Sequence, residues 1–253
     1  MTFFSVRRVV FLAMLVLAAP AVHAQTVDEI VARNIQAKGG AALLKSTNTV
    51  RTTGSGTMQG SKIAITTTSK RPYFVRNEMT LAGNTIVMGF DGTTAWMAPA
   101  GLPAQPIPPG PQTEVMKQNS QIDSPLFDYK AKGTRIELGT PVTEAGRKLH
   151  HLIVTPKASP AMHYYLDAET GLEAKMVIDT EDSGQTIRME MRFSDFRPIE
   201  GRMVPFTVTQ FVNGKPVAEM NFEKIEFNVP IDDAVFKMPA KQSGGKDPVS
   251  GAN

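Results

Sequence analysis

The sequence predicts a mainly β protein built on an antiparallel sheet, and three observations support this prediction. Residues 186–193 alternate strictly between apolar and polar side chains, as a strand with one buried face does. Residues 172–178 and 204–208 repeat the alternation on either side. Turn residues separate the three segments, namely Gly171, Ser183-Gly184, Gly201 and Asn213-Gly214. We expect a meander whose apolar face, Ile187, Met189, Met191 and Phe193, covers either an ordinary core or a cavity for an apolar ligand.

Residues 1–24 have the features of a secretory signal peptide. Arg7 and Arg8 precede an apolar run over residues 9–19, and Val22-His23-Ala24 forms a small-x-small cleavage site. The apolar run is shorter than the ~20 residues that a membrane-spanning helix needs. We therefore expect cleavage near Ala24 and export to the periplasm, rather than an uncleaved membrane anchor.

Composition excludes several classes of protein. The 253-residue chain has no cysteine, which excludes a disulfide framework, a thiolate metal site and an acylated cysteine at the cleavage site. Removing Arg7 and Arg8 from the 27 basic residues leaves 25 against 24 acidic ones in the mature chain. Because both signs are interleaved along the predicted strands, the surface is not a nucleic-acid footprint.

The first part of the mature chain predicts a helix followed by strands. Residues 26–37 have apolar positions at helical spacing and two acids in the first turn, and Gly39-Gly40 ends the helix. Residues 41–45 add a further turn. The predicted strands then cover residues 62–66, 73–80, 86–90 and 94–97, after a first strand that starts at Val50, and Asp91-Gly92 predicts the last hairpin.

A proline-rich segment follows. Residues 99–111 contain six prolines, too many lost amide donors for an interior strand, so we expect a surface crossover rather than a ligand for a partner. Residues 112–120 and 125–129 predict short helices or turns at the mouth of the sheet. Their apolar members would cap a cavity, and these are Val115, Met116, Leu126 and Phe127.

Strands resume over residues 135–138, 149–155 and 162–166, and the final strand covers residues 216–228. In this last strand Met220 and Phe222 share one face, whereas Ile225 and Phe227 share the other, which predicts a bulge near Glu223-Lys224. Residues 231–236 predict a last helical turn that plugs the sheet, and residues 241–253 a disordered polar tail. We expect one domain over residues 25–240.

The sequence contains no recognisable catalytic or metal-binding constellation. His150 and His151 point to opposite faces of one strand, and His163 lies on another strand. Glycines 54, 56 and 60 lack the lysine and hydroxyl of a phosphate loop, and Asp167 with Glu169 belongs to a turn. We therefore predict a protein that is not an enzyme and has no cofactor and no metal. The alternative is a hydrolase whose catalytic residues are scattered along the sequence and form no local motif.

Methionines are more informative than the titratable groups. Twelve of the 14 lie after residue 24, and those at 79, 88, 176, 189, 191 and 220 fall on apolar strand faces. A flexible thioether adapts to ligands of variable shape, such as acyl chains, but it also fills ordinary cores. The pattern leaves both interpretations open.

One series of motifs suggests a family. Lys70-Arg71-Pro72 starts a strand, and Asp91-Gly92 is followed by Trp96 in an Asp-Gly-x-x-x-Trp pattern within residues 70–101. Residues 152–159 (LIVTPKAS) and Ser124-Pro125-Leu126 extend the series. In this order, behind a signal peptide, these segments resemble the periplasmic outer-membrane lipoprotein carrier (LolA-like) superfamily.

The resemblance implies an open, strongly curved antiparallel half-barrel whose concave apolar face is covered by a few short helices acting as a lid. It also implies that acyl chains enter beneath the lid, and that Arg71 holds the lid through hydrogen bonds to helix backbone. The arginine guanidinium has five N–H donors in a fixed geometry, which suits this role. We expect the lid and cavity residues to be Arg71, Phe74, Met88, Phe90, Trp96, Met176, Met189, Met191 and Phe193.

The function predicted on this basis is binding and transport of lipoproteins or lipids in the periplasm by a monomer, with transport partners at the inner and outer membranes. The alternative is an envelope-stress sensor or protein-interaction module of the same fold, which would use the sheet edge or the outer face. A cavity filled by the protein's own side chains would favour this alternative.

Overall fold

The computed structural model describes residues 25–240 except residues 111, 112, 115, 118, 119, 158 and 183. The predicted signal peptide, the polar tail and Val115 lie outside the described residues.

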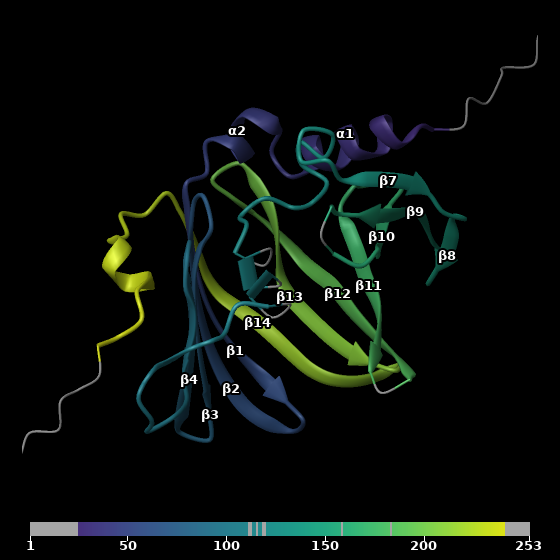
Figure 1. The fold of residues 1–253 in the computed structure, drawn as a ribbon. Helices are drawn as coiled ribbons and strands as arrows, with labels where there is room; N and C mark the ends of the chain where they lie inside the picture. Colours follow the sequence, from purple (N-terminus) through teal and green to yellow (C-terminus); the bar gives the residue numbers. More distant parts are fainter. Residues whose placement is uncertain are drawn as a thin grey trace, which may run out of the picture.

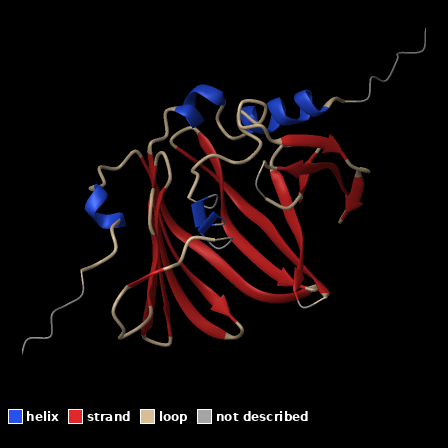
Figure 2. Ribbon diagram, viewed as in Figure 1, coloured by secondary structure: helices blue, strands red, loops and turns tan. Residues whose placement is uncertain are grey.

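The described chain forms one antiparallel sheet of 14 strands with a few helices (Figures 1 and 2). In chain order the elements are α1 Val27–Ala37, α2 Ala41–Lys45, β1 Thr49–Met58, β2 Ser61–Lys70, β3 Phe74–Leu81, β4 Asn84–Asp91, β5 Ala95–Ala98, β6 Gln105–Pro106, β7 Arg135–Leu138, β8 Val142–Glu144, β9 Arg147–Thr155, β10 Met162–Asp167, β11 Glu173–Asp182, β12 Gln185–Ile199, β13 Arg202–Val212, β14 Lys215–Phe227 and the 3₁₀ helix η1 Asp233–Phe236.

The strand order is β6-β5-β4-β3-β2-β1-β14-β13-β12-β11-β10-β9-β7, with β8 beside β9. The first and last strands, β1 and β14, are therefore neighbours in the middle of the sheet, and β6 and β7 are its edges. Within the described residues these edges do not pair, so the sheet is open. Figure 1 shows it curving so that β2–β4 face β9–β11, with β12–β14 crossing between them. This confirms the predicted mainly β, open half-barrel.

Helix α1 begins with the predicted polar turn. The Thr26 hydroxyl accepts a hydrogen bond from the Glu29 amide, and the Glu29 carboxylate accepts one from the Thr26 amide at 2.7 Å, which together form a capping box. Ile30 and Val31, which follow the cap, are buried. Asn34 anchors the helix to the sheet, because its side-chain amide donates to the Gly171 carbonyl at 2.8 Å.

The meander is confirmed, and so is the bulge in its last strand. Strands β11 to β14 pair in succession through turns, and Asn213 and Gly214 both adopt the positive φ that a tight hairpin turn requires. Along β1, Thr53 pairs with Lys224 but Gly54 pairs with Phe222, so Glu223 is the extra residue.

The proline-rich segment is not entirely loop. Gln105 and Pro106 form the short strand β6, which pairs with β5, and the Ile107 amide donates to the Ala95 carbonyl at 2.8 Å. Pro106 is tolerated because β6 is an edge strand with solvent or loop on its other side.

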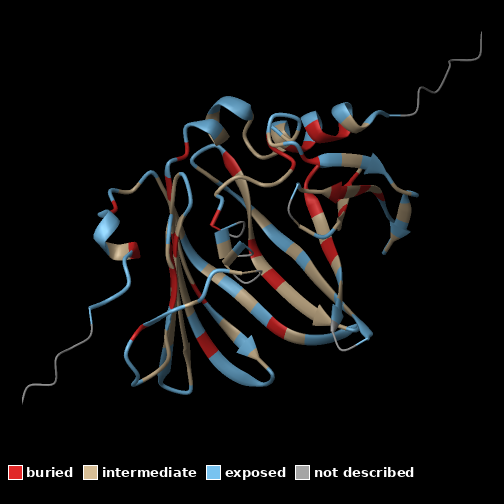
Figure 3. Cartoon of the chain, in the orientation of Figure 1, coloured by how far each residue is buried: buried red, intermediate tan, exposed pale blue. Residues whose placement is uncertain are grey.

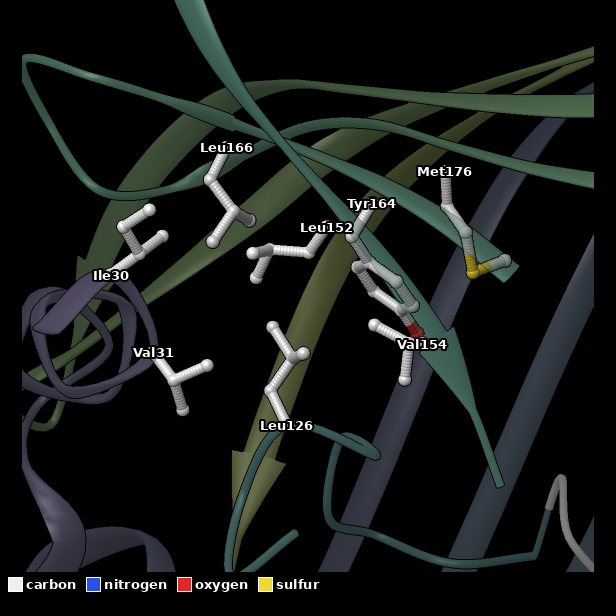
Figure 4. Close-up of a cluster of buried hydrophobic side chains, with 8 residues drawn as sticks. All are labelled: Ile30, Val31, Leu126, Leu152, Val154, Tyr164, Leu166 and Met176. Carbon is white, nitrogen blue, oxygen red and sulfur yellow. The ribbon is translucent and has the colours of Figure 1, made fainter. Parts of the chain in front are cut away.

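Two hydrophobic clusters attach helix α1 and the long connection between β6 and β7 to the two halves of the sheet. The larger lies between α1 and strands β9–β11 and includes Leu126 of the long connection from β6 to β7 (Figure 4). The smaller contains Val75, Phe90 and Ala95, with Ile107 and Met116 packed on it. Between them, Figure 3 shows mostly half-buried and exposed residues on the middle strands, and β12 contains no buried residue. No helix in the described ranges is long and apolar enough to cross a membrane.

Candidate functional site

A row of side chains crosses β10–β13 on the concave face. Tyr164 pairs with Met176, Met176 with Met191, and Met191 with Gln210. Met162, Ile178 and Met189 form a second row in the same way. Because directly paired residues of antiparallel strands share a face, the methionines of three strands meet on one wall.

This wall lines a compartment of about 890 Å³. Ligand pockets in proteins span about 300 to 1,000 Å³, so the space is large enough for a substantial apolar ligand. The covering segments, in contrast to the sheet, contribute mostly polar and charged residues to the same compartment, namely Lys38, Tyr73, Glu114, Lys117, Gln121, Asp123, Ser124, Lys132, Thr134 and Lys157.

A second compartment of about 350 Å³ lies beside it, beneath the two N-terminal helices. Ile35 and Leu44 line it from the helices, and Phe127 lines it from the long connection. Phe222, Ile225 and Phe227 all line it from β14, although simple alternation would separate Phe222 from the other two. The bulge at Glu223 turns them to the same side.

The two compartments share a wall. Lys38, Ile122, Asp123 and Ser124 line both of them. The segment 122–124 therefore lies between the two spaces.

Arg71 ties this segment to the end of α2. Its guanidinium donates to both carboxylate oxygens of Asp123, at 2.5 and 2.7 Å, and to the backbone carbonyls of Thr47 at 2.6 Å and Leu44 at 3.3 Å. The hydrogen bonds from Asp123 raise the pKa of Arg71, against the opposing effect of burial. The side chain of Asp123 is 11% exposed and that of Arg71 is 30% exposed, so the carboxylate is largely shielded from water, and the contact is bidentate, the strong form of such a pair.

A second arginine holds the same end of α2. Arg202 is 4% exposed and donates to the Thr47 hydroxyl at 2.9 and 3.2 Å and to the Leu43 carbonyl at 3.3 Å. Its guanidinium lies 4.3 Å from the centre of the Phe227 ring. The last carbonyls of a helix lack partners within the helix, and here Arg71 from the turn between β2 and β3 and Arg202 from β13 donate to them.

Lys132 is a half-buried cation at the rim of the larger compartment. It donates to the Ser124 carbonyl at 3.3 Å and lies 5.9 Å from the Phe127 ring centre. Burial lowers the pKa of Lys132, although Asp123 partly opposes this effect. Burial likewise raises the pKa of Tyr164, which keeps its phenol neutral on the compartment wall.

The predicted site residues fall into three groups. Met176, Met189 and Met191 line the larger compartment, and Phe193 packs against the larger hydrophobic cluster beside it. Phe90 is buried in the smaller cluster, and Met88 follows the same alternation on β4, so both are on the concave face but outside the two compartments. Arg71 contacts the segment between the compartments.

Phe74 and Trp96 lie on the opposite, outer face, which corrects their expected position in the cavity. The Phe74 ring lies 5.4 Å from that of Phe236 in η1, and the Trp96 indole donates to the Phe236 carbonyl at 2.8 Å. Trp96 packs flat on Gly89, where an added Cβ would lie 2.3 Å from its ring. Because η1 covers the outer face there, Phe74 and Trp96 are large apolar residues on that face, and an apolar side chain alone did not indicate the inside.

Sequence reasoning missed Asp123, Lys132 and Arg202. The first two lie in an aperiodic connection, and Arg202 resembles an ordinary strand-end charge. It also missed a pairing on the outer face, where His151 and His163 share a hydrogen bond of 2.8 Å between ring nitrogens and His151 stacks on Tyr165. In the described residues no group of three or more histidine and acidic side chains could hold a metal ion.

Comparisons with known proteins agree on the fold. No protein-family model and no curated protein matches the sequence. Solved structures do match. They include an outer membrane lipoprotein-sorting protein domain from Vibrio parahaemolyticus (13% identity, TM-score 0.54, covering 83% of this chain and 97% of that one) and a LolA superfamily protein from Nitrosomonas europaea (12%, 0.56, 85% and 98%). A DUF1329 family protein from Desulfovibrio piger matches equally well (12%, 0.56, 85% and 98%). The LolA-like fold that the sequence predicts is therefore confirmed.

Proposed function

We propose that this LolA-like half-barrel binds the acyl chains of lipids or lipoproteins in its concave compartments and carries them through the periplasm without catalysing a reaction. The observation that carries the proposal is the methionine wall, which lines a compartment of about 890 Å³ at the edge of the larger hydrophobic cluster. A cavity closed by the protein's own side chains would have favoured an interaction module.

The energetics of burial support acyl chains as ligands. Each methylene removed from water contributes about 0.8 kcal/mol, so even part of a chain provides useful affinity without polar recognition. A single myristoyl chain binds a bilayer with an association constant of only about 10⁴ M⁻¹, so a protein cavity can compete with a membrane for it. Methionine suits a wall that must fit chains of different shape.

Exchange of the ligand would be controlled by the segments above the sheet. In this proposal the contacts of Arg71 with Thr47, Leu44 and Asp123 hold α2 and segment 122–124 in the closed arrangement. Breaking them would open a path into both compartments. The signal-like residues 1–24 and the fold shared with the lipoprotein-sorting domain from Vibrio support a periplasmic carrier, which would act as a monomer with partners at the inner and outer membranes.

The test begins with protein purified from the periplasm of its own host, analysed by native mass spectrometry and lipid extraction. We expect co-purified lipid, and uptake of labelled lipid from vesicles after delipidation. A Met189→Trp variant, which fills part of the compartment, should take up less lipid. The matched control is Thr209→Trp, on the outer face of the neighbouring strand, which should behave as the wild type. Ligand-free protein that also takes up no lipid would exclude the carrier function.

A further inference from the structure

The charges around the larger compartment are not balanced. Four lysines line it, of which only Lys38 has a carboxylate partner, Glu173 at 2.8 Å. Within the described part of the chain, Lys117, Lys132 and Lys157 form no ion pair. Three ammonium groups are thus available at one cavity.

The acidic side chains of the compartment do not neutralise these lysines. Asp123 is already bound by both prongs of Arg71. Glu114 is the one remaining acid that lines the compartment, against three lysines, and it is exposed as Lys117 and Lys157 are. The unpaired charge at the rim of the compartment is therefore positive.

Among the described residues, Lys132 is the clearest case of a half-buried cation without an ion-pair partner. Its ammonium is half-buried, and it contacts a carbonyl at 3.3 Å and an aromatic ring. Removing an ammonium from water without a counter-ion is costly, and burial lowers its pKa accordingly. Lys117 lies 5.7 Å from the Tyr73 ring centre, likewise without an anion. An anion at this rim would offset the cost at Lys132.

The apolar and cationic residues line the same space from different sides. The sheet contributes Met162, Met176, Met189 and Met191, whereas the covering segments contribute the lysines. A ligand complementary to both must have an apolar chain and an anionic head.

We infer that the larger compartment binds an anionic lipid, whose chain lies along the methionine wall and whose negatively charged head group is held by Lys132, Lys117 and Lys157. This inference rests on the proposed function and specifies the class of lipid. It predicts selection by head-group charge, which apolar burial alone cannot provide, because chains of the same length bury the same area.

The experiment compares uptake from vesicles of phosphatidylglycerol and phosphatidylcholine with identical acyl chains, by re-isolating the protein and counting lipid. We expect phosphatidylglycerol to exceed phosphatidylcholine about tenfold, the effect of one charge-assisted hydrogen bond. Lys132→Met and Lys157→Gln should each lower phosphatidylglycerol uptake more than phosphatidylcholine uptake and so reduce this ratio. The control is Lys62→Gln, which also removes one positive charge, but from an exposed position on β2. It should leave the ratio of the two lipids unchanged.

The outcomes separate this inference from the proposed function. Equal uptake of the two lipids by the wild type would overturn the inference and leave the carrier function intact, whereas uptake of neither would refute the carrier function itself. Displacement of phosphatidylglycerol by millimolar inorganic phosphate would point to a free-anion site instead. Because Lys157 is exposed, its replacement tests the head-group contact even if Lys132→Met unfolds the protein.

Discussion

The guanidinium of Arg71 and the carboxylate of Asp123 form a two-pronged ion pair, with N–O distances of 2.5 and 2.7 Å, that joins the end of α2 to the segment between the two compartments. The pair connects the turn between β2 and β3 to a loop 52 residues later, so it can fasten the sheet to its covering. This relationship leads to the first prediction.

Arg71→Leu should accelerate lipid transfer to acceptor vesicles by about tenfold, since one charge-assisted contact holding the closed arrangement contributes ~1.5 kcal/mol or more. Asp123→Leu should have a similar effect, because it removes the other half of the same contact. Transfer is followed with a fluorescent lipid, and stability by urea unfolding.

The control for this prediction is Arg188→Leu, which breaks an exposed pair with Asp179 on the outer face. It should change neither transfer nor stability appreciably. If Arg71→Leu unfolds the protein while lipid exchange in the remaining folded fraction is unchanged, Arg71 has a structural role and does not control the covering segments.

Phe193 and Met191 should respond differently to truncation, although they are two residues apart on one strand face. Phe193 packs against the larger hydrophobic cluster, so Phe193→Ala should cost about 3 kcal/mol of unfolding free energy with lipid uptake retained. Met191 also lines the compartment, so Met191→Ala should cost less and reduce uptake. A large stability loss at both positions would indicate a packed core and no cavity wall.

The fluorescence of Trp96 should not respond to ligand binding. It is the single tryptophan of the chain, fully buried on the outer face under η1, so its fluorescence spectrum should not change when lipid is taken up. Gly89→Ala should destabilise the protein by about 1 to 3 kcal/mol, because the new methyl would overlap the indole, and should leave uptake per folded molecule unchanged.

The control is Gly110→Ala, where an added Cβ meets open space. It should be neutral. A shift of the Trp96 emission on lipid binding, with no change in unfolding behaviour, would indicate that Trp96 contacts the ligand.

Stability should decrease as the pH falls below about 6.5, the ordinary pKa of histidine. Burial and the neighbouring His163 lower the pKa of His151, and burial lowers that of His150. Below the unfolded-state pKa, the unfolded chain therefore binds more protons than the folded one. The unfolding free energy thus decreases as the pH is lowered, until the histidines of the folded protein are protonated as well.

This effect is measured by urea unfolding between pH 5 and pH 8. His151→Gln should remove part of the slope, and His150→Gln a separate part, since adjacent residues of a strand lie on opposite faces. A slope that neither substitution changes would show that other groups cause the pH dependence.

Much of the architecture follows from local patterns. The alternation in residues 186–193 predicted both the strand and the face on which its methionines lie, because the two-residue period of a strand leaves no other arrangement. The change of phase between Phe222 and Ile225 predicted the bulge at Glu223 for the same reason. The helical spacing of apolar residues over 26–37 and the two acids in the first turn predicted α1, because these signals act within a few residues; the structure adds the capping box of Thr26 and Glu29.

The site was only partly accessible to such reasoning. Met176, Met189 and Met191 were identified from alternation, and Arg71 from a family resemblance. Phe74 and Trp96 were assigned to the wrong face because η1, about 140 residues further along the chain, makes their outer face apolar. Asp123 and Lys132 lie in a connection without periodicity, where no local rule indicates which residues face the cavity.

The sequence by itself determined most of the strands and turns, though not the short strands β6 and β8, and which side chains share a face of a strand, because these properties depend on neighbours in the chain. Tertiary structure alone decided that β1 and β14 meet in mid-sheet, that Arg71 reaches Asp123, and that three lysines with no ion pair among the described residues line the same compartment as the methionine wall. These contacts depend on curvature and on segments far apart in sequence, whose approach is set by the burial of the whole sheet.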